Sequence, residues 1–167
     1  NYCMKLYNAA AYHLMGIWWG LLGAFGAEGT PESKVYMRWY LWNFGAEQDA
    51  NTIGVNSSAG PDCCIRIQDN DLWHLRQSFT LRATSTSTIP RNTAWYRFEL
   101  KAFFDGASSD YRARFYAPDG TLVEEISSNF SGTALNTINT VYVLGGTWNG
   151  ANMGIAVDDF ALNDTTG

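Results

Sequence analysis

Alternation of apolar and charged side chains over residues 94–104 is the feature that most constrains the fold. The apolar positions are Tyr96, Phe98, Leu100, Ala102 and Phe104, and the charged positions between them are Arg97, Glu99 and Lys101. This period of two is typical of a strand with one buried face, whereas a helix would distribute the charges around its circumference. A sheet with one dry face is typically antiparallel and packs that face on a second layer. The stretch therefore predicts the central strand of an antiparallel two-sheet β-sandwich.

Other short segments with strand composition lie on both sides of this one, separated by turn residues. Asp69-Asn70-Asp71 predicts a tight hairpin, and residues 84–88 predict an exposed linker. Many short strands with scarcely a helical pattern between them indicate an all-β sandwich or barrel, and residues 1–167 are expected to form a single domain. The predicted strands are residues 2–6, 34–44, 51–55, 63–68, 72–75, 80–84, 111–117, 121–127, 140–144 and 154–162.

Residues 9–26 form a run of eighteen residues that carry no formal charge. This length is at the lower limit for a membrane-spanning helix. Four glycines interrupt the run, paired tryptophans lie in its middle, and no basic flank sets an orientation. We therefore expect two short strands with a glycine-rich connection and no membrane span. If part of that connection is exposed, its apolar residues form a patch for a partner; the alternative is that they cap one end of the core. These residues are Ile17, Trp18, Trp19, Leu21, Leu22 and Phe25.

The turn at Pro118-Asp119-Gly120 allows the register of one hairpin to be predicted. With three residues in the loop, Ala117 faces Thr121, Phe115 faces Val123 and Arg114 faces Glu124. A two-residue loop would place the apolar Phe115 opposite a carboxylate, so the three-residue loop is preferred.

Composition restricts the classes of partner. A net charge of −5 argues against nucleic acid and against an anionic membrane surface. Aromatic residues make up 15% of the chain, and this suits sheet surfaces, glycan platforms and protein interfaces alike. Cys3, Cys63 and Cys64 are too few for a disulfide framework and are interpreted as small buried residues.

Four segments carry a family resemblance that spans nearly the whole chain. They are Asn1-Tyr-Cys-Met-Lys-Leu6, Asn92-Thr-Ala-Trp-Tyr-Arg-Phe-Glu-Leu100, Ala117-Pro-Asp-Gly-Thr-Leu-Val123 and the closing Gly154-Ile-Ala-Val-Asp-Asp-Phe-Ala-Leu-Asn-Asp-Thr-Thr-Gly167. In order and spacing they resemble concanavalin A-like, laminin-G-like jelly rolls of the kind found in structural proteins of tailed-phage virions. The resemblance implies two antiparallel sheets stacked as a curved sandwich, and such a fold serves binding and assembly as well as catalysis.

The residues do not predict a catalytic site. β-Glucan-cleaving jelly rolls share a Glu-x-Asp-x-x-Glu strand, and the nearest match here starts at Glu47 and Asp49 but ends in Thr52. Glu124 and Glu125 are adjacent on a strand and point to opposite faces. His13 and His74 match no metal or nucleophile motif, so no enzyme is expected.

One metal possibility comes from the resemblance alone. In related carbohydrate-binding jelly rolls an aspartate on the closing strand helps to hold calcium, and Asp158 occupies a similar place. Calcium requires six to eight oxygens, and the sequence offers no visible oxygen set around Asp158, so backbone hydrogen bonding is the preferred interpretation. We expect no metal and no other cofactor.

Two functions remain. The first is a non-catalytic structural protein of a virion, a capsid decoration or tail component that contacts other virion proteins or copies of itself. The second is a glycan-binding, lectin-like module of a secreted or tail-borne protein. The aromatic residues that favour the second are Tyr36, Tyr40, Trp42, Trp73 and Trp148.

Overall fold

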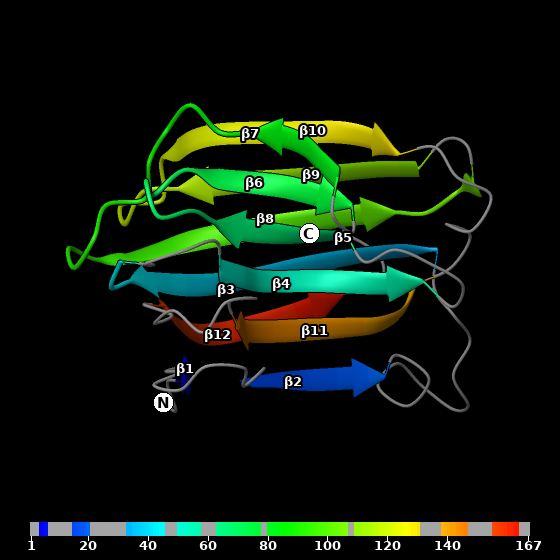
Figure 1. The fold of residues 1–167 in the computed structure, drawn as a ribbon, viewed down its shortest axis with the longest axis horizontal. Helices are drawn as coiled ribbons and strands as arrows, with labels where there is room; N and C mark the ends of the chain where they lie inside the picture. Colours follow the sequence, from blue (N-terminus) through cyan, green and yellow to red (C-terminus); the bar gives the residue numbers. More distant parts are fainter. Residues whose placement is uncertain are drawn as a thin grey trace.

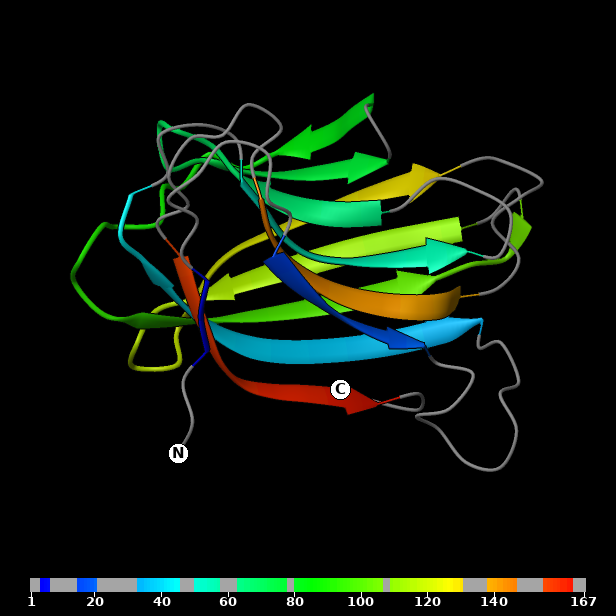
Figure 2. The same ribbon diagram turned by 60° about the horizontal axis from the view of Figure 1, so that its bottom comes forward.

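The computed structural model describes residues 4–6, 15–20, 33–45, 50–57, 63–77, 80–106, 109–130, 138–146 and 155–163. These residues form two six-stranded antiparallel sheets that stack face to face (Figures 1 and 2). No α-helix occurs in the described ranges, and no helix there is long and apolar enough to cross a membrane. The predicted all-β, antiparallel two-sheet sandwich is confirmed.

Each sheet combines strands from distant parts of the sequence. Sheet A has the order β1-β12-β3-β8-β9-β10 and sheet B the order β2-β11-β4-β5-β6-β7. The strands of sheet A are β1 (Met4–Leu6), β12 (Ile155–Asn163), β3 (Lys34–Asn43), β8 (Trp95–Phe103), β9 (Ser109–Tyr116) and β10 (Leu122–Phe130). The strands of sheet B are β2 (Met15–Gly20), β11 (Ile138–Gly146), β4 (Ala50–Ser57), β5 (Cys63–Ile67), β6 (Trp73–Gln77) and β7 (Thr80–Thr84).

The predicted central strand lies inside sheet A as β8, between β3 and β9. Its burial alternates at every position, as does that of β3, because each strand turns one side to the core and the other outward. The closing strand β12 inserts between β1 and β3, so the two ends of the described chain share one sheet. Part of the uncharged run 9–26 is the strand β2, as expected; the rest of that run lies outside the described residues.

Aromatic rings from both sheets meet between the layers. Trp39 stacks on Phe98 within sheet A, with ring centroids 5.6 Å apart. Trp73 reaches across from sheet B and meets Phe98 edge-on at 5.5 Å and Phe115 at 6.3 Å. Trp39, Trp73 and Phe98 are fully buried, so these contacts form the centre of the hydrophobic core.

The register of the β9–β10 hairpin differs from the prediction after its second residue pair. The three-residue loop is present, since the Ala117 amide donates to the Thr121 carbonyl at 2.9 Å. A β-bulge between Leu122 and Glu124 then shifts the pairing by one residue. Phe115 therefore faces Glu124, and Arg114 faces Glu125, so the predicted Phe115–Val123 and Arg114–Glu124 pairs are wrong.

Hydrogen bonds explain why this register is stable. Glu124 accepts from the backbone amides of Thr86 and Ser87, both at 2.8 Å, and from the Thr86 hydroxyl at 3.0 Å. Although Glu124 is opposite Phe115 in the backbone pairing, its carboxylate binds the β7–β8 connection near the start of β10. That connection is mostly exposed, as predicted, but Ser85 within it is buried, and its hydroxyl accepts from the Trp73 amide at 2.9 Å.

Candidate binding face

The outer face of sheet A is formed by the alternate positions of β3, β8 and β9 that point away from the core. Most of these side chains are half-buried, so they form a continuous and partly exposed surface across three neighbouring strands. They are Lys34, Tyr36, Arg38, Tyr40, Trp42, Trp95, Arg97, Glu99, Lys101, Phe103, Asp110, Arg112, Arg114 and Tyr116.

A stacked group occupies the middle of this face. Arg97 and Tyr116 are cross-strand partners, and the guanidinium lies 3.9 Å above the centroid of the tyrosine ring. The Tyr116 hydroxyl donates to Glu99 Oε2 at 2.7 Å. Burial, together with this hydrogen bond to the Glu99 carboxylate, raises the pKa of Tyr116 above its usual value, so the phenol remains a donor at neutral pH.

Several charged residues of the face are paired with carboxylates on β9 and on the neighbouring strand β10. Arg114 Nε lies 2.6 Å from Glu125 Oε2, and Arg112 Nε lies 3.6 Å from the other oxygen of the same carboxylate. Lys101 donates to Asp110 at 3.0 Å. Exposed pairs of this kind add little stability, about 0–1 kcal/mol each, but they hold long side chains in defined positions.

Three aromatic residues gather at one end of the face. Trp42 and Trp95 are cross-strand partners whose rings meet edge-on with centroids 5.8 Å apart, and Phe44 lies 6.1 Å from Trp42. Phe44 is 38% exposed. The Trp42 indole N–H has no hydrogen-bond partner among the described residues. We call Trp42, Phe44 and Trp95 the aromatic group.

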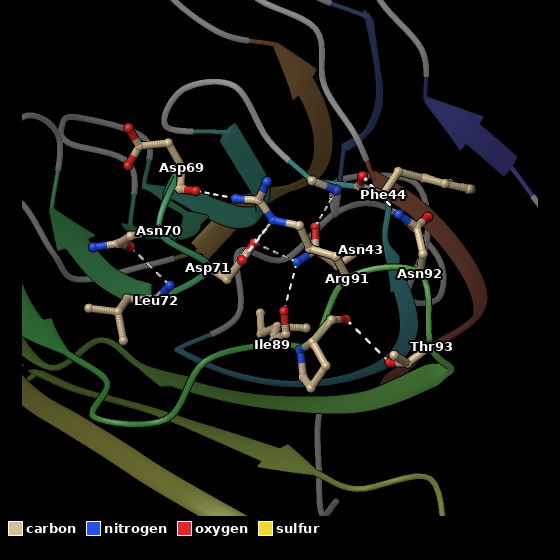
Figure 3. Close-up of polar contacts among 12 residues, drawn as sticks. Asn43, Phe44, Asp69, Asn70, Asp71, Leu72, Ile89, Arg91, Asn92 and Thr93 are labelled. Atoms are coloured by element: carbon tan, nitrogen blue, oxygen red, sulfur yellow. Dashed lines mark hydrogen bonds and ion pairs between the residues drawn. The ribbon is translucent and has the colours of Figure 1, made fainter.

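A polar network lies around Asn43, between Trp42 and Phe44 in the sequence (Figure 3). Asn43 follows Trp42 and is fully buried; its amide donates to Asp71 Oδ1 at 2.9 Å and to the Ile89 carbonyl at 2.8 Å. Its side-chain oxygen accepts from the Gly45 amide at 2.9 Å. One side chain thereby joins the end of β3 to the β5–β6 turn and to the chain entering β8.

Arg91 completes the network from the opposite side. Its Nε donates to both carboxylate oxygens of Asp71, at 2.7 and 2.8 Å, and its Nη2 donates to the Asp69 carbonyl. Figure 3 shows the guanidinium extended between Asp69 and Asp71. The predicted Asp69-Asn70-Asp71 hairpin is confirmed, and its carbonyl and carboxylate oxygens anchor an arginine near the start of β8.

The structure places the aromatic residues suggested for glycan binding in different environments. Tyr36, Tyr40 and Trp42 lie on the outer face of sheet A. Trp73 is fully buried in the core, so its interpretation as a glycan contact is wrong. The pattern of β6 explains this, because Trp73 lies on the same side of the strand as the buried Leu75. Trp148 lies outside the described residues.

The carboxylates weighed for catalysis are not brought together. Glu124 binds the β7–β8 connection, while Glu125 binds arginines on the outer face, as their opposite directions predicted. Glu47 and Asp49 lie outside the described residues, and Thr52 lies within β4.

The remaining residues weighed in the sequence are the two histidines and Asp158. His74 is 4% exposed, and His13 lies outside the described part of the chain. Asp158 Oδ1 accepts the Asp159 amide at 2.8 Å, in a stretch where the β12–β3 register shifts. Among the residues that the structure describes, no three His, Cys, Asp or Glu side chains are close enough to hold a metal ion. Whether Asp158 binds calcium is not tested by these contacts, so the expectation of no metal there stays a prediction.

Comparison with known proteins supports the fold class. No known protein family and no curated protein matches the sequence. Alginate lyase Aly36B is similar in structure, with a TM-score of 0.57, 12% identity, and coverage of 81% of this chain and 71% of the lyase. The basic winged bean lectin, solved with Tn-antigen, has a TM-score of 0.52 and 10% identity over 83% of this chain and 79% of the lectin.

A phage protein also shares the fold. The CBM2 module of the evolved Dit of Lactobacillus casei BL23 phage J-1 has a TM-score of 0.51 and 11% identity, and the match covers 89% of this chain and 67% of that chain. At such identities these similarities show the jelly-roll sandwich alone. Enzymes and binding proteins both use it, so function has to be argued from the surface of this chain.

Sequence reasoning missed two parts of the site. Trp95 and Tyr116 were not named as surface aromatics, although the alternation in β8 and β9 places both opposite the core-facing residues. The network of Asn43, Asp71 and Arg91 left no signal in the sequence, because its members lie 28 and 20 positions apart.

Proposed function

We propose that this chain is a non-catalytic binding module that serves as a structural component of a virus particle, in a capsid decoration or in the tail. It acts through protein–protein contacts made by the outer face of sheet A. The observation that carries the proposal is the composition of that face: tyrosine, tryptophan and arginine side chains cover neighbouring strands and are held in place by contacts among themselves.

These residue types suit a protein interface. Tyrosine, tryptophan and arginine supply much of the binding energy in such interfaces, because they bury large areas and retain a polar end. On this face Arg97 is stacked on Tyr116, and Arg114 is paired with Glu125. Because these charged side chains are already paired, a partner protein that buries them leaves fewer charges without a counter-charge than it would on a face with unpaired charges.

The role in a virus particle is supported from two directions. The closing segment of the sequence resembles tailed-phage structural proteins, and a phage Dit module has the same fold. The absence of catalysis is supported by Glu124 and Glu125, which are committed to opposite sides of β10. Partners would be other virion proteins or further copies of the chain.

The test uses purified particles of the virus that encodes the chain. We expect the wild-type protein to be present at a fixed copy number per particle. We expect a Tyr36→Ala/Tyr40→Ala variant to be incorporated at least roughly tenfold less, because it loses two large side chains of the interface. Leu81→Ala, on β7 at the edge of sheet B, is the control and keeps wild-type incorporation. Particles without the chain, or equal incorporation of the face variant, contradict the proposal.

Glycan binding is the second candidate, and the aromatic group favours it. Trp42, Phe44 and Trp95 offer ring faces and edges at one end of a partly exposed sheet, as sugar rings require. This role would suit a secreted or tail-borne protein. A glycan screen with millimolar or tighter binding that Trp95→Ala abolishes, and that Leu81→Ala leaves intact, would establish it. Turnover of a β-glucan or of alginate by the purified chain would contradict both candidates.

A further inference from the structure

The described sandwich has an open side where both sheets end. β10 is the last strand of sheet A and β7 the last strand of sheet B, and the two strands are in contact at the top of Figure 1. An edge strand presents backbone N–H and C=O groups that can pair with another chain. Natural proteins protect such edges with short strands, bulges, charged residues or proline.

Most of this open side is protected. β7 has only five residues, and the register of its pairing with β6 shifts within the strand. The first part of β10 follows Pro118, contains the bulge between Leu122 and Glu124, and carries two adjacent carboxylates. These features disfavour strand addition at β7 and at the start of β10.

Within the part of the chain that the structure describes, the second part of β10 has none of these protecting features. Residues 126–130 contain no charge, proline or glycine, and they pair with β9 in continuous register from Ile126–Ala113 to Phe130–Ser109. Among the described strands, β9 is the only one that pairs with β10. Ser127 and Asn129 are exposed. This stretch is therefore a regular, uncharged edge.

We propose that residues 126–130 are the site at which a second copy of this chain adds, antiparallel, to sheet A. The sequence of the stretch is complementary to itself when the two-fold axis passes through Ser128. Ser128 then faces Ser128 of the second copy, Ser127 faces Asn129, and Ile126 faces Phe130. Polar residues are thus opposite polar residues at positions 127, 128 and 129, and Glu124 and Glu125 of the two copies fall outside the paired stretch.

Other registers are less complementary. An axis through Ser127 would place Ile126 opposite Ser128 and Glu125 opposite Asn129, which separates the two apolar residues. In the register centred on Ser128, Glu125 also keeps its contacts with Arg112 and Arg114 on the same sheet. The second copy can thus extend sheet A while both ion pairs of Glu125 are retained.

Strand addition at one edge joins a small part of each surface, so the dimer is expected to depend on protein concentration. Sedimentation velocity over a roughly hundredfold concentration range measures it. We expect wild type to shift from monomer to dimer, Ser128→Lys to remain monomeric, and the control Thr84→Lys, on the exposed edge of β7, to dimerise like wild type. A monomeric wild type, or a dimeric Ser128→Lys variant, overturns the proposal.

Cysteine cross-linking tests the register. Residues directly opposite in an antiparallel pair have Cα atoms about 4.5–5.5 Å apart, within reach of a disulfide, whereas diagonal neighbours are about 7–8 Å apart. In a Cys3→Ser background, Ser128→Cys is expected to cross-link under mild oxidation, and the control Ser127→Cys is not. Equal cross-linking of both variants, or of neither, contradicts the two-fold axis at Ser128.

Thermal unfolding of each reduced variant verifies that it is folded, so that loss of dimer is not mistaken for loss of structure. The inference is independent of the proposed function. If the chain dimerises through β10 but is absent from particles, the dimer interface is supported and the virion role is contradicted. If the chain is monomeric but present in particles, the virion role is supported and the dimer interface is contradicted.

Discussion

Asn43 and Glu124 are polar side chains that satisfy backbone groups where the chain leaves its sheets. Asn43 is fully buried and binds three different segments near the end of β3. Glu124 is half-buried and binds two consecutive amides of the β7–β8 connection. Buried backbone groups without hydrogen-bond partners are energetically costly. Each of the two residues is therefore expected to contribute more to the free energy of unfolding than the size of its side chain indicates.

Asn43→Ala is expected to lower the free energy of unfolding by about 2–4 kcal/mol, because it leaves the Ile89 carbonyl and the Gly45 amide without their partner. Asn70→Ala is the matched control, since exposed Asn70 accepts one bond, from the Leu72 amide at 3.1 Å. We expect it to cost about 1 kcal/mol or less. Urea unfolding measures both, and equal losses would mean that the Asn43 network does not stabilise the fold.

Glu124 is expected to make stability depend on pH in the acid range. Burial raises the pKa of Glu124, but its hydrogen bonds from Thr86 and Ser87 outweigh burial and hold that pKa below its ordinary value. The folded state therefore binds fewer protons than the unfolded chain near pH 4. Stabilisation is complete above the unfolded pKa of about 4.3 and is lost as the pH falls through the lower, folded pKa.

The measurement compares wild type with Glu124→Gln in urea unfolding at several pH values. At pH 7 the variant is expected to be less stable by about 1–2 kcal/mol, and the difference is expected to shrink as the medium becomes acidic. Other carboxylates titrate in both proteins, so only the difference between the two curves reports Glu124. A difference that stays constant down to pH 2 would rule out this role.

At the level of the elements, two turns depend on glycine for different reasons. Gly45, after β3, has a φ of 101°, and an added Cβ would lie 3.1 Å from Arg91 Cδ. Gly120, between β9 and β10, has a φ of 87° with nothing within 4 Å of an added Cβ. Both positions carry a backbone that other residues adopt at a cost, and Gly45 is also packed against the polar network.

Gly120→Ala is expected to lower stability by about 1 kcal/mol through backbone strain alone. Gly45→Ala is expected to cost more, because it also displaces the Arg91 side chain from Asp71. Chemical unfolding of the two variants compares them directly. A larger loss for Gly120→Ala would show that packing around Gly45 relaxes without penalty.

The strands themselves were predictable, and their irregularities were not. The interval Thr80–Thr84 matches the predicted strand, and β3 and β8 differ from prediction by one residue at an end or at both ends. The β9–β10 turn was predicted from Pro118-Asp119-Gly120, whereas the bulge after Leu122 was not. A turn is determined by its own residues, but this bulge is stabilised by Thr86 and Ser87, which are distant in sequence.

At the level of the whole molecule, the two layers are joined by an aromatic core whose centre is Trp73 and Phe98. Trp73→Ala is expected to lower the free energy of unfolding by about 3–5 kcal/mol, because it removes the ring that crosses from sheet B to sheet A. Trp95→Ala, on the partly exposed outer face, is the matched control and is expected to cost much less. Thermal or urea unfolding separates the two, and similar losses would contradict the assignment of Trp73 to the core alone.

The sequence by itself determined the class of fold and the sides of β3 and β8 that enter the core. Alternation of residue types is a local property, and burial follows from it, as Trp39 and Phe98 demonstrate. It also placed Tyr36, Tyr40 and Trp42 together on one side of β3. Alternation in β6 likewise places Trp73 on the same side of the strand as Leu75, which is the core side.

Only the tertiary structure decided how these strands combine. It inserted β12 between β1 and β3, shifted the register of β10, and brought Asn43, Asp71 and Arg91 into one network. These outcomes depend on contacts between residues that are far apart in sequence, and no local pattern encodes such contacts. For the same physical reason the outer face of sheet A became a surface only when β3, β8 and β9 were aligned side by side.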